Sequence, residues 1–317
     1  MINTELGMKV ILRIPNSVFI KFIIIKAMQI RHQLKNANTT RLITPAILGI
    51  LLLLYAPVLL YWVQGWLNKS ISIEHEYFSH GIIGLPFAAY LCWLNRKKWQ
   101  RLPDISHPLG VALLVLGGVF YLSGVSEWVN ISFPTILTGL CLWLKGIPGL
   151  KLQGFALILV LLATPTSVPY LITPYTLPLQ SFIAGTAGFI LSQIGMQVTV
   201  DGVNIYVGGR IVEVAPYCAG LKMLFTTFYV GLMLLYWTGA LSSRRKSIWF
   251  LSLAVLISIC ANIVRNTLLS FFHGTGQDGA FHWLHDGWGG DLYSAVMLLS
   301  LVPTLNWIEK YFAEVSE

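Results

Sequence analysis

Three side chains in the C-terminal third of the chain could together support nucleophilic chemistry, and the first is a cysteine. Cys218 stands between Pro216 and Gly220 in "VAPYCAGLKMLF", at the start of an apolar segment. Proline suits the first turn of a helix, where unpaired N–H groups and the positive helix end favour a thiolate. Gly220 would keep this turn uncrowded. Cys218 is therefore a candidate nucleophile, although free cysteines in apolar helices also serve as small packing residues.

The second side chain is Arg265, in the apolar stretch "CANIVRNTLLSFF". An arginine within a membrane helix is costly and needs a partner or a function. Asn262 lies three residues earlier, on the same helical face, where it could orient the guanidinium group. The alternative is an arginine that extends to the lipid headgroups.

The third is a histidine of the segment "HGTGQDGAFHWLHDGWGGDLYS", which contains three histidines and three aspartates. No established zinc-ligand spacing occurs there, so we favour one general base over a metal site. His285 and His282 both remain candidates for that base.

Two further residues could support the site. His80 precedes Gly81 at the start of an apolar run and is either a site residue or a buried histidine that caps the helix. Glu213 lies five residues before Cys218 and is either a site acid or a loop charge.

The elements that must position these residues are membrane helices. The chain has 317 residues, of which 56% are hydrophobic and 11% charged, and its mean hydropathy is +0.70. These values exclude a soluble globular domain and indicate a polytopic membrane protein. The four cysteines are widely spaced, so the sequence predicts neither a disulfide framework nor a thiolate zinc site.

The net charge of +8 is concentrated at the N-terminus, where residues 1–42 hold seven Lys/Arg and one acid. This pattern is typical of a membrane-orienting tail and does not indicate nucleic-acid binding. We expect a basic cytoplasmic tail at 1–42, one membrane domain at 43–310 and a cytoplasmic C-terminal tail at 311–317.

Apolar runs predict an all-α fold with about eight transmembrane helices. The expected spans are 43–66, 81–95, 109–126, 131–144, 152–172, 218–239, 247–268 and 291–308. A ninth run, 178–197, is rich in small residues, and we expect it to lie at the outer interface or to enter the membrane and return. The alternating segment "QVTVDGVNIYVGGRIVEV" that follows predicts a short β-like hairpin.

The basic loops decide the orientation. The N-terminal tail, residues 96–101, 145–151 and 244–246, and Lys310 hold 17 of the 21 Lys/Arg. They share the cytoplasmic side only if residues 173–217 lie outside the membrane on the opposite side. Cys218, Arg265 and His285 would then share the outer face of the cytoplasmic membrane.

The motifs also resemble those of a known family, the exosortases and archaeosortases. The resemblance covers about residues 65–305, and we expect the chain to belong to a cyanobacterial-type branch. Its parts are "EYFSHGIIGLP", "TPTSVPY", "GMQVTVDGVNIYV", "VEVAPYCAGLKMLF", "ANIVRNTLLS" and "HDGWGGDLYS".

This resemblance implies a membrane-embedded cysteine protease or transpeptidase that cleaves the C-terminal, PEP-CTERM type sorting signal of exported proteins. The family's catalytic cysteine, arginine and histidine fall on Cys218, Arg265 and His285, and His285 meets the family's His-x-x-x-Gly pattern with Gly289. Ala219 departs from the serine that is usual after the cysteine, which bears on substrate preference. We expect substrate-binding or supporting roles for Glu213, Gly220, Asn262 and His80.

The expected partners are exported proteins with a hydrophobic C-terminal signal, together with membrane lipids. Neither a metal nor an organic cofactor is required. A transporter or assembly scaffold is the alternative function, but the sequence shows no inverted repeat. A thiol oxidoreductase would need a second cysteine at the outer face, and Cys260 is poorly placed for that role.

Overall fold

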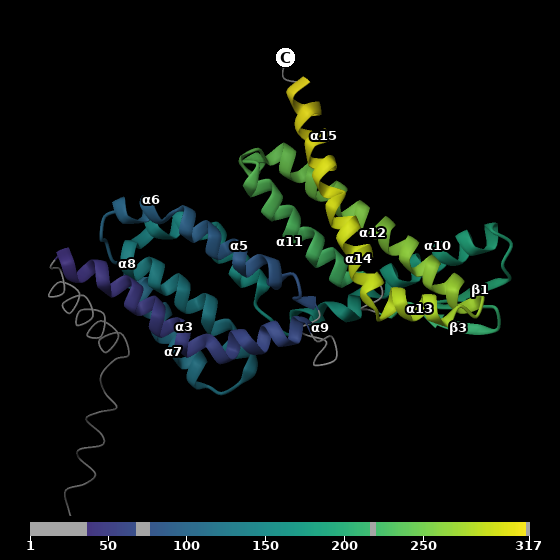
Figure 1. Cartoon of the computed structure of the whole chain (residues 1–317), viewed down its shortest axis with the longest axis horizontal. Helices are drawn as coiled ribbons and strands as arrows, with labels where there is room; N and C mark the ends of the chain where they lie inside the picture. Colours follow the sequence, from purple (N-terminus) through teal and green to yellow (C-terminus); the bar gives the residue numbers. More distant parts are fainter. Residues whose placement is uncertain (1–36, 68–76, 216–219, 315–317) are drawn as a thin grey trace, which may run out of the picture. The chain divides into compact units, whose positions relative to one another are not determined.

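The computed structural model describes residues 37–67, 77–215 and 220–314, so the candidate nucleophile Cys218 lies outside the described residues. The described chain is predominantly helical and includes a small three-stranded sheet (Figure 1). Four of its helices are long and apolar enough to cross a membrane: Ala46–Leu67, Ser126–Ala163, Arg244–Gly274 and Trp288–Glu314. The predicted class, an all-α polytopic membrane protein, is confirmed.

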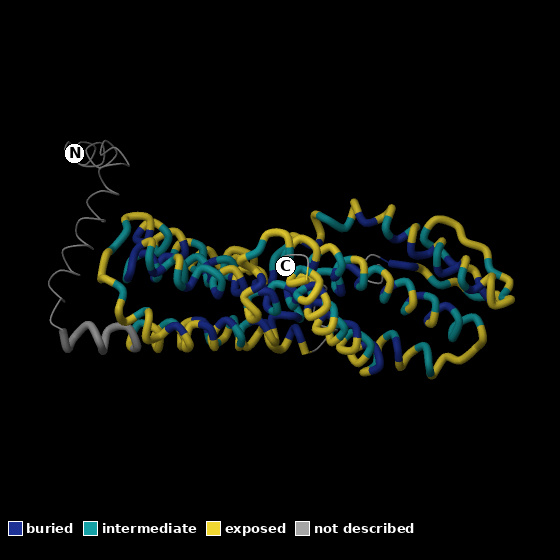
Figure 2. Tube along the Cα trace, turned by 90° about the horizontal axis from the view of Figure 1, so that it is seen from above, coloured by how far each residue is buried: buried dark blue, intermediate teal, exposed yellow. Residues whose placement is uncertain are grey.

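The chain forms two compact units. The first unit comprises residues 1–64 and 85–164, and the second comprises residues 65–84 and 165–317. Figure 2 shows many exposed positions along the helices, and in α3 (Ala37–Leu67) these include Ile50, Leu53 and Leu60. Exposed apolar surface of this extent suits a helix that faces lipid.

The first unit is built from helices alone. They are α3 (Ala37–Leu67), α5 (Gly81–Leu94), α6 (Arg96–Arg101), α7 (Pro108–Leu122) and α8 (Ser126–Ala163), of which α3 and α5 also reach into the second unit. Two buried hydrogen bonds join α3 to α8: one between the Tyr55 and Ser132 hydroxyls at 2.5 Å, and one donated by Trp62 Nε1 to Asn130 Oδ1 at 2.8 Å. Such bonds between helices stabilise packing inside a membrane.

Helix α8 contains a break at Gly146, whose φ of 60° and ψ of −153° are not helical. The sequence predicts a basic loop at 145–151 between two spans, and the break at Gly146 lies within that range, although residues 147–151 are helical. Lys145 is buried, with its Nζ 2.7 Å from Asp104 Oδ1 and donating to the Leu102 carbonyl at 2.8 Å. The expected spans 131–144 and 152–172 therefore fall on the two parts of α8, and the second part ends at Ala163.

The second unit adds the sheet to its helices. Its elements are α9 (Val168–Ile172), η1 (Thr173–Thr176), α10 (Leu177–Gln193), β1 (Val198–Asp201), β2 (Asn204–Val207), β3 (Arg210–Glu213), α11 (Leu221–Trp237), η2 (Ala240–Ser242), α12 (Arg244–Gly274), α13 (Asp278–His285), α14 (Trp288–Leu299) and α15 (Leu301–Glu314). The expected span 291–308 thus begins in α14 and ends in α15.

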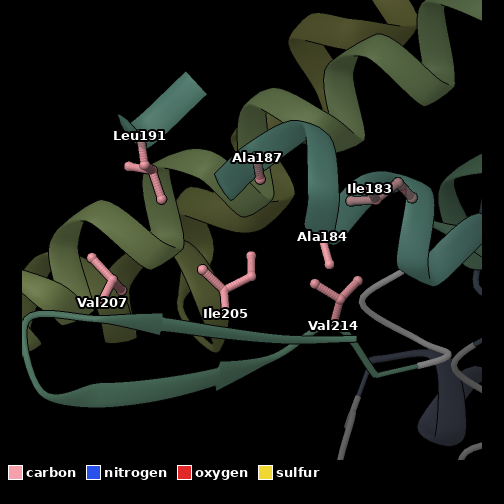
Figure 3. Packing of buried hydrophobic residues seen from close by; sticks show 7 residues of the cluster. All are labelled: Ile183, Ala184, Ala187, Leu191, Ile205, Val207 and Val214. Carbon is pink, nitrogen blue, oxygen red and sulfur yellow. The ribbon is translucent and has the colours of Figure 1, made fainter. Parts of the chain in front are cut away.

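The three strands form an antiparallel sheet in the order β1-β2-β3, one strand more than the predicted hairpin. Their β-branched residues favour strands, and Gly208 and Gly209 suit the tight turn between β2 and β3. One face of the sheet packs on α10. The shared core consists of Ile183, Ala184, Ala187 and Leu191 from α10 with Ile205, Val207 and Val214 (Figure 3). The run 178–197 is therefore largely a helix with one face covered by protein, and its place at the outer interface stays a prediction.

Candidate active site

Helix α12 carries most of the candidate site. Buried polar side chains recur at every fourth position, at Ser258, Asn262, Asn266 and Ser270, so they share one face. Arg265 follows Asn262 by three residues and is half-buried. A polar face of this length inside an apolar helix is costly unless it serves packing or function.

Arg265 reaches the end of α13. Its Nη2 donates to the backbone carbonyl of His285 at 3.4 Å, across 20 positions of sequence. Its Nε atom is buried and has no hydrogen-bond partner among the described residues. The guanidinium group thus lies beside His285 and retains a directed donor there.

The His285 ring is held by two neighbours. Its Nδ1 lies 2.6 Å from Asp286 Oδ1, and the Phe281 ring stacks on it with centroids 5.2 Å apart and an interplanar angle of 9°. In the tautomer that donates Nδ1–H to the carboxylate, Nε2 carries the lone pair that accepts a proton. This arrangement suits a general acid or base.

His282 also contacts Asp286, but less closely. Its Nδ1 lies 3.3 Å from Asp286 Oδ2, and its side chain is 69% exposed, against 27% for His285. Burial acts to raise the pKa of Asp286, but hydrogen bonds from His285 and His282 outweigh it and hold that pKa below its ordinary value. Asp286 is therefore a stable negative charge beside both imidazoles.

A pocket of about 120 Å³ opens where β3, α12 and α13 meet. It is lined by Ile211, Val212 and Glu213 from β3, by Asn266, Leu269 and His273 from α12, and by Phe281 and His285 from α13. The structure thus brings Glu213 and His285, which are far apart in sequence, to one cavity.

Gly220 packs closely on the polar face of α12. Its φ is +82°, a conformation that residues with side chains rarely adopt, and a Cβ atom there would lie 2.7 Å from Asn262 Cγ. Both residues are buried. The chain next to Cys218 in sequence therefore contacts the helix turn that precedes Arg265.

A family model, described as transmembrane exosortase, matches residues 66–302, which is most of the chain. The chain belongs to the transmembrane exosortase family. No curated protein and no solved structure matches the chain significantly. The family match does not distinguish branches, so the cyanobacterial-type branch stays a prediction. All seven predicted site residues fall within the matched segment of this exosortase.

His80 lies elsewhere in the second unit of the exosortase. It is buried, its ring centroid lies 4.5 Å from that of Tyr229 in α11, and its carbonyl accepts hydrogen bonds from Ile83 and Gly84 in the first turn of α5. His80 does not line the pocket formed by β3, α12 and α13. Its contacts are those of a residue that packs the start of a helix.

Two residues of this candidate site, Asp286 and Phe281, were not predicted to support it. Their spacing gives a signal, because Asp286 follows His285 directly and Phe281 lies one helical turn before it. Within the described parts of the chain, no group of three or more His, Cys, Asp or Glu side chains is arranged to hold a metal ion.

Proposed function

We propose that this exosortase is a membrane-embedded cysteine protease or transpeptidase. It cleaves the C-terminal, PEP-CTERM type sorting signal of exported proteins at the outer face of the cytoplasmic membrane. The observation that supports this most is the contact between Arg265 and His285 beside a pocket that Glu213 also lines. Glu213 and Gly220 flank Cys218 in sequence, and both lie against α12, the helix that carries Arg265.

Cys218 is the proposed nucleophile. Its thiolate sulfur attacks the carbonyl carbon of the scissile peptide bond, and a tetrahedral intermediate forms. The carbon–nitrogen bond then breaks, the departing amine takes a proton, and the N-terminal part of the substrate remains as a thioester on the sulfur. Attack by water or by an amine acceptor breaks the carbon–sulfur bond, releases the N-terminal part and restores the thiolate.

Arg265 is the proposed oxyanion donor. The negative charge of the tetrahedral intermediate develops on the former carbonyl oxygen, and a pre-positioned donor in a site of low polarity stabilises it by about 3 to 4 kcal/mol. The buried Nε of Arg265 supports this role, because its hydrogen-bonding direction is not used within the described residues.

His285 is the proposed acid and base. It gives its proton to the departing amine and then takes one from the acceptor. The short contact with Asp286 and the stacked Phe281 ring support this role, because they fix the orientation of the imidazole. Asp286 acts as a positioning residue for His285.

Mass spectrometry of exported proteins tests the activity. We expect their hydrophobic C-terminal tails to be removed in cells with the wild-type enzyme and retained with His285→Ala. His282→Ala is the matched control and should cause a milder defect, because its imidazole is largely exposed and lies outside the pocket. Complete tail removal by His285→Ala at normal abundance would exclude this assignment.

The proposed location needs a separate test. A cysteine introduced at Asp201 in β1 should react with an impermeant thiol reagent added from outside the cell. Labelling only from the cytoplasm would overturn the outward orientation of the sheet and of the site.

A further inference from the structure

Strand β3 is an edge strand that borders the candidate site. The sheet order is β1-β2-β3, so β3 pairs with β2 on one side, and no other described strand pairs with it. An open strand edge presents a row of backbone N–H and C=O groups that another extended chain can pair with.

The pairing register identifies the groups that face outward. In an antiparallel pair, residues that exchange hydrogen bonds alternate with residues that do not. Val207 and Arg210 close the two-residue turn, and Val214 N–H donates to the Val203 carbonyl at 2.9 Å. Ile211 and Glu213 are therefore the residues of β3 whose N–H and C=O point away from β2. Within the described residues, no backbone hydrogen bond engages these groups.

The pocket adjoins this strand edge. Successive side chains of a strand point to opposite faces, yet the three consecutive residues Ile211, Val212 and Glu213 all line one cavity. A cavity that all three residues line therefore lies along the edge of the strand, where it borders their backbone and not one face of side chains. His285 and Phe281 of α13 form part of the opposite wall.

We infer that the open edge of β3 binds the substrate as an added, antiparallel or parallel strand. This inference rests on the proposed function and names how its substrate is held. The occupant is an extended peptide segment next to the scissile bond, whose backbone pairs with Ile211 and Glu213. One of its side chains enters the pocket, which at about 120 Å³ has room for a single side chain of moderate size.

Peptide is the class of ligand that this edge fits. Donors and acceptors that alternate along an extended backbone match another peptide backbone, whereas a lipid headgroup offers no such series. Pairing at β3 also brings the peptide alongside His285, because the same cavity contains both. Affinity then comes from the backbone, and preference for particular side chains comes from the pocket.

The first test compares two substitutions at one position of the full-length enzyme. Ile211→Pro removes the outward N–H, and an edge strand tolerates proline where its N–H does not serve the sheet. Ile211→Ala removes the same side chain and keeps the N–H. We expect kcat/KM for a substrate peptide to be about tenfold lower for Ile211→Pro than for Ile211→Ala, mainly through a higher KM. A tenfold change corresponds to the loss of one or two hydrogen bonds.

The second test changes the substrate and uses the wild-type enzyme. Replacing one backbone amide at a time by an ester removes one N–H donor, while the scissile amide is kept. We expect kcat/KM to fall at every second position next to the scissile bond. A substrate bound as a strand gives this period of two, whereas a helical or irregular segment does not.

The outcomes separate this inference from the proposed function. Equal kcat/KM for Ile211→Pro and Ile211→Ala, with no alternation in the ester series, would overturn the added strand and leave the cysteine chemistry standing. Full activity of Cys218→Ser would instead overturn the proposed function. If Ile211→Pro proves unfolded by thermal denaturation, the ester series with the wild-type enzyme decides alone.

Discussion

The two units place buried polar groups in different ways. In the first unit they meet in pairs across helices, as Tyr55 meets Ser132 and Trp62 meets Asn130. In the second unit four of them, Ser258, Asn262, Asn266 and Ser270, lie along one face of α12, next to Arg265 and to the pocket that contains His285. Burying polar groups in an apolar protein is costly in both places.

This difference predicts different roles for the buried polar groups of the two units. A polar pair between helices stabilises the packing, so its loss should lower stability and leave the rate of the folded enzyme unchanged. Polar groups that converge on a cavity can act on a substrate, so their loss should lower the rate. Four substitutions test this division.

Cys218→Ser should have the largest effect. The hydroxyl has a much higher pKa than a thiol and is a poor nucleophile, so peptide cleavage should fall by at least about 10³-fold at normal abundance. Immunoblots of a substrate should show its uncleaved form in the membrane. Cys92→Ser and Cys141→Ser are the controls from the first unit and should process it normally. Normal maturation in Cys218→Ser cells would exclude the nucleophile assignment.

Arg265→Lys should lower kcat/KM by about 10² to 10³-fold although the positive charge is kept. A compact ammonium group cannot reproduce the directed donors of the planar guanidinium. Arg244→Lys, at the exposed start of the same helix, is the control and should stay within about twofold of wild type. Near-normal cleavage by Arg265→Lys would indicate that Arg265 only extends its charge toward the lipid headgroups.

Asp286→Ala should lower kcat about tenfold, because His285 loses the carboxylate that orients its ring. Asp286→Glu should restore part of the rate, since a carboxylate returns. Hydrogen bonds from His285 and His282 hold the pKa of Asp286 below its ordinary value, so this carboxylate stays ionised at neutral pH. The wild-type pH–rate profile above pH 5 should therefore contain no step from Asp286. Equal rates for wild type and Asp286→Ala would remove its positioning role.

Lys145→Ala should change stability and leave catalysis almost unaffected. It leaves Asp104 and the Leu102 carbonyl without their partner, which costs about 1 to 3 kcal/mol, and the partial exposure of Asp104 keeps the value below that of a fully buried pair. Thermal unfolding in detergent should show a lower midpoint, while kcat of the folded enzyme stays within about twofold. The exposed Lys97 supplies the control, since Lys97→Ala should shift neither quantity. A large loss of kcat in Lys145→Ala would break the division between the units.

Much of the fold could be predicted from the sequence, because long apolar runs have few alternatives to helices. Within the predicted basic loop at 145–151, the surroundings of Lys145 differ from those expected for a physical reason. Charge alone suggested solvent, whereas Lys145 is satisfied inside the first unit by Asp104, a partner more than 40 positions away that no local pattern reveals. The third strand was missed because short strands depend on packing against α10 more than on their own propensity.

The site was predictable in part. Arg265 and His285 were expected on one face, and they are in contact. The pocket was not predicted, since it depends on the side-by-side placement of β3, α12 and α13. The roles of Asp286 and Phe281 depend on side-chain orientation, which neighbouring positions in the sequence do not specify. The prediction that Cys218 is the nucleophile remains to be tested.

The break at Gly146 has a consequence far along the chain. A continuous α-helix of 38 residues would be about 57 Å long, almost twice the hydrocarbon thickness of a bilayer. A Cβ atom on Gly149 would lie 3.1 Å from the Cys141 carbonyl oxygen, eight residues earlier, so the chain bends sharply at Gly146 and does not continue straight. A straight α8 that crossed once would change the number of crossings before Arg265 from odd to even, or the reverse, compared with a chain that turns back there. The side of the membrane on which the proposed exosortase site opens therefore depends on whether the number of crossings before Arg265 is odd or even. One glycine in the first unit, far along the chain from the site, decides that number.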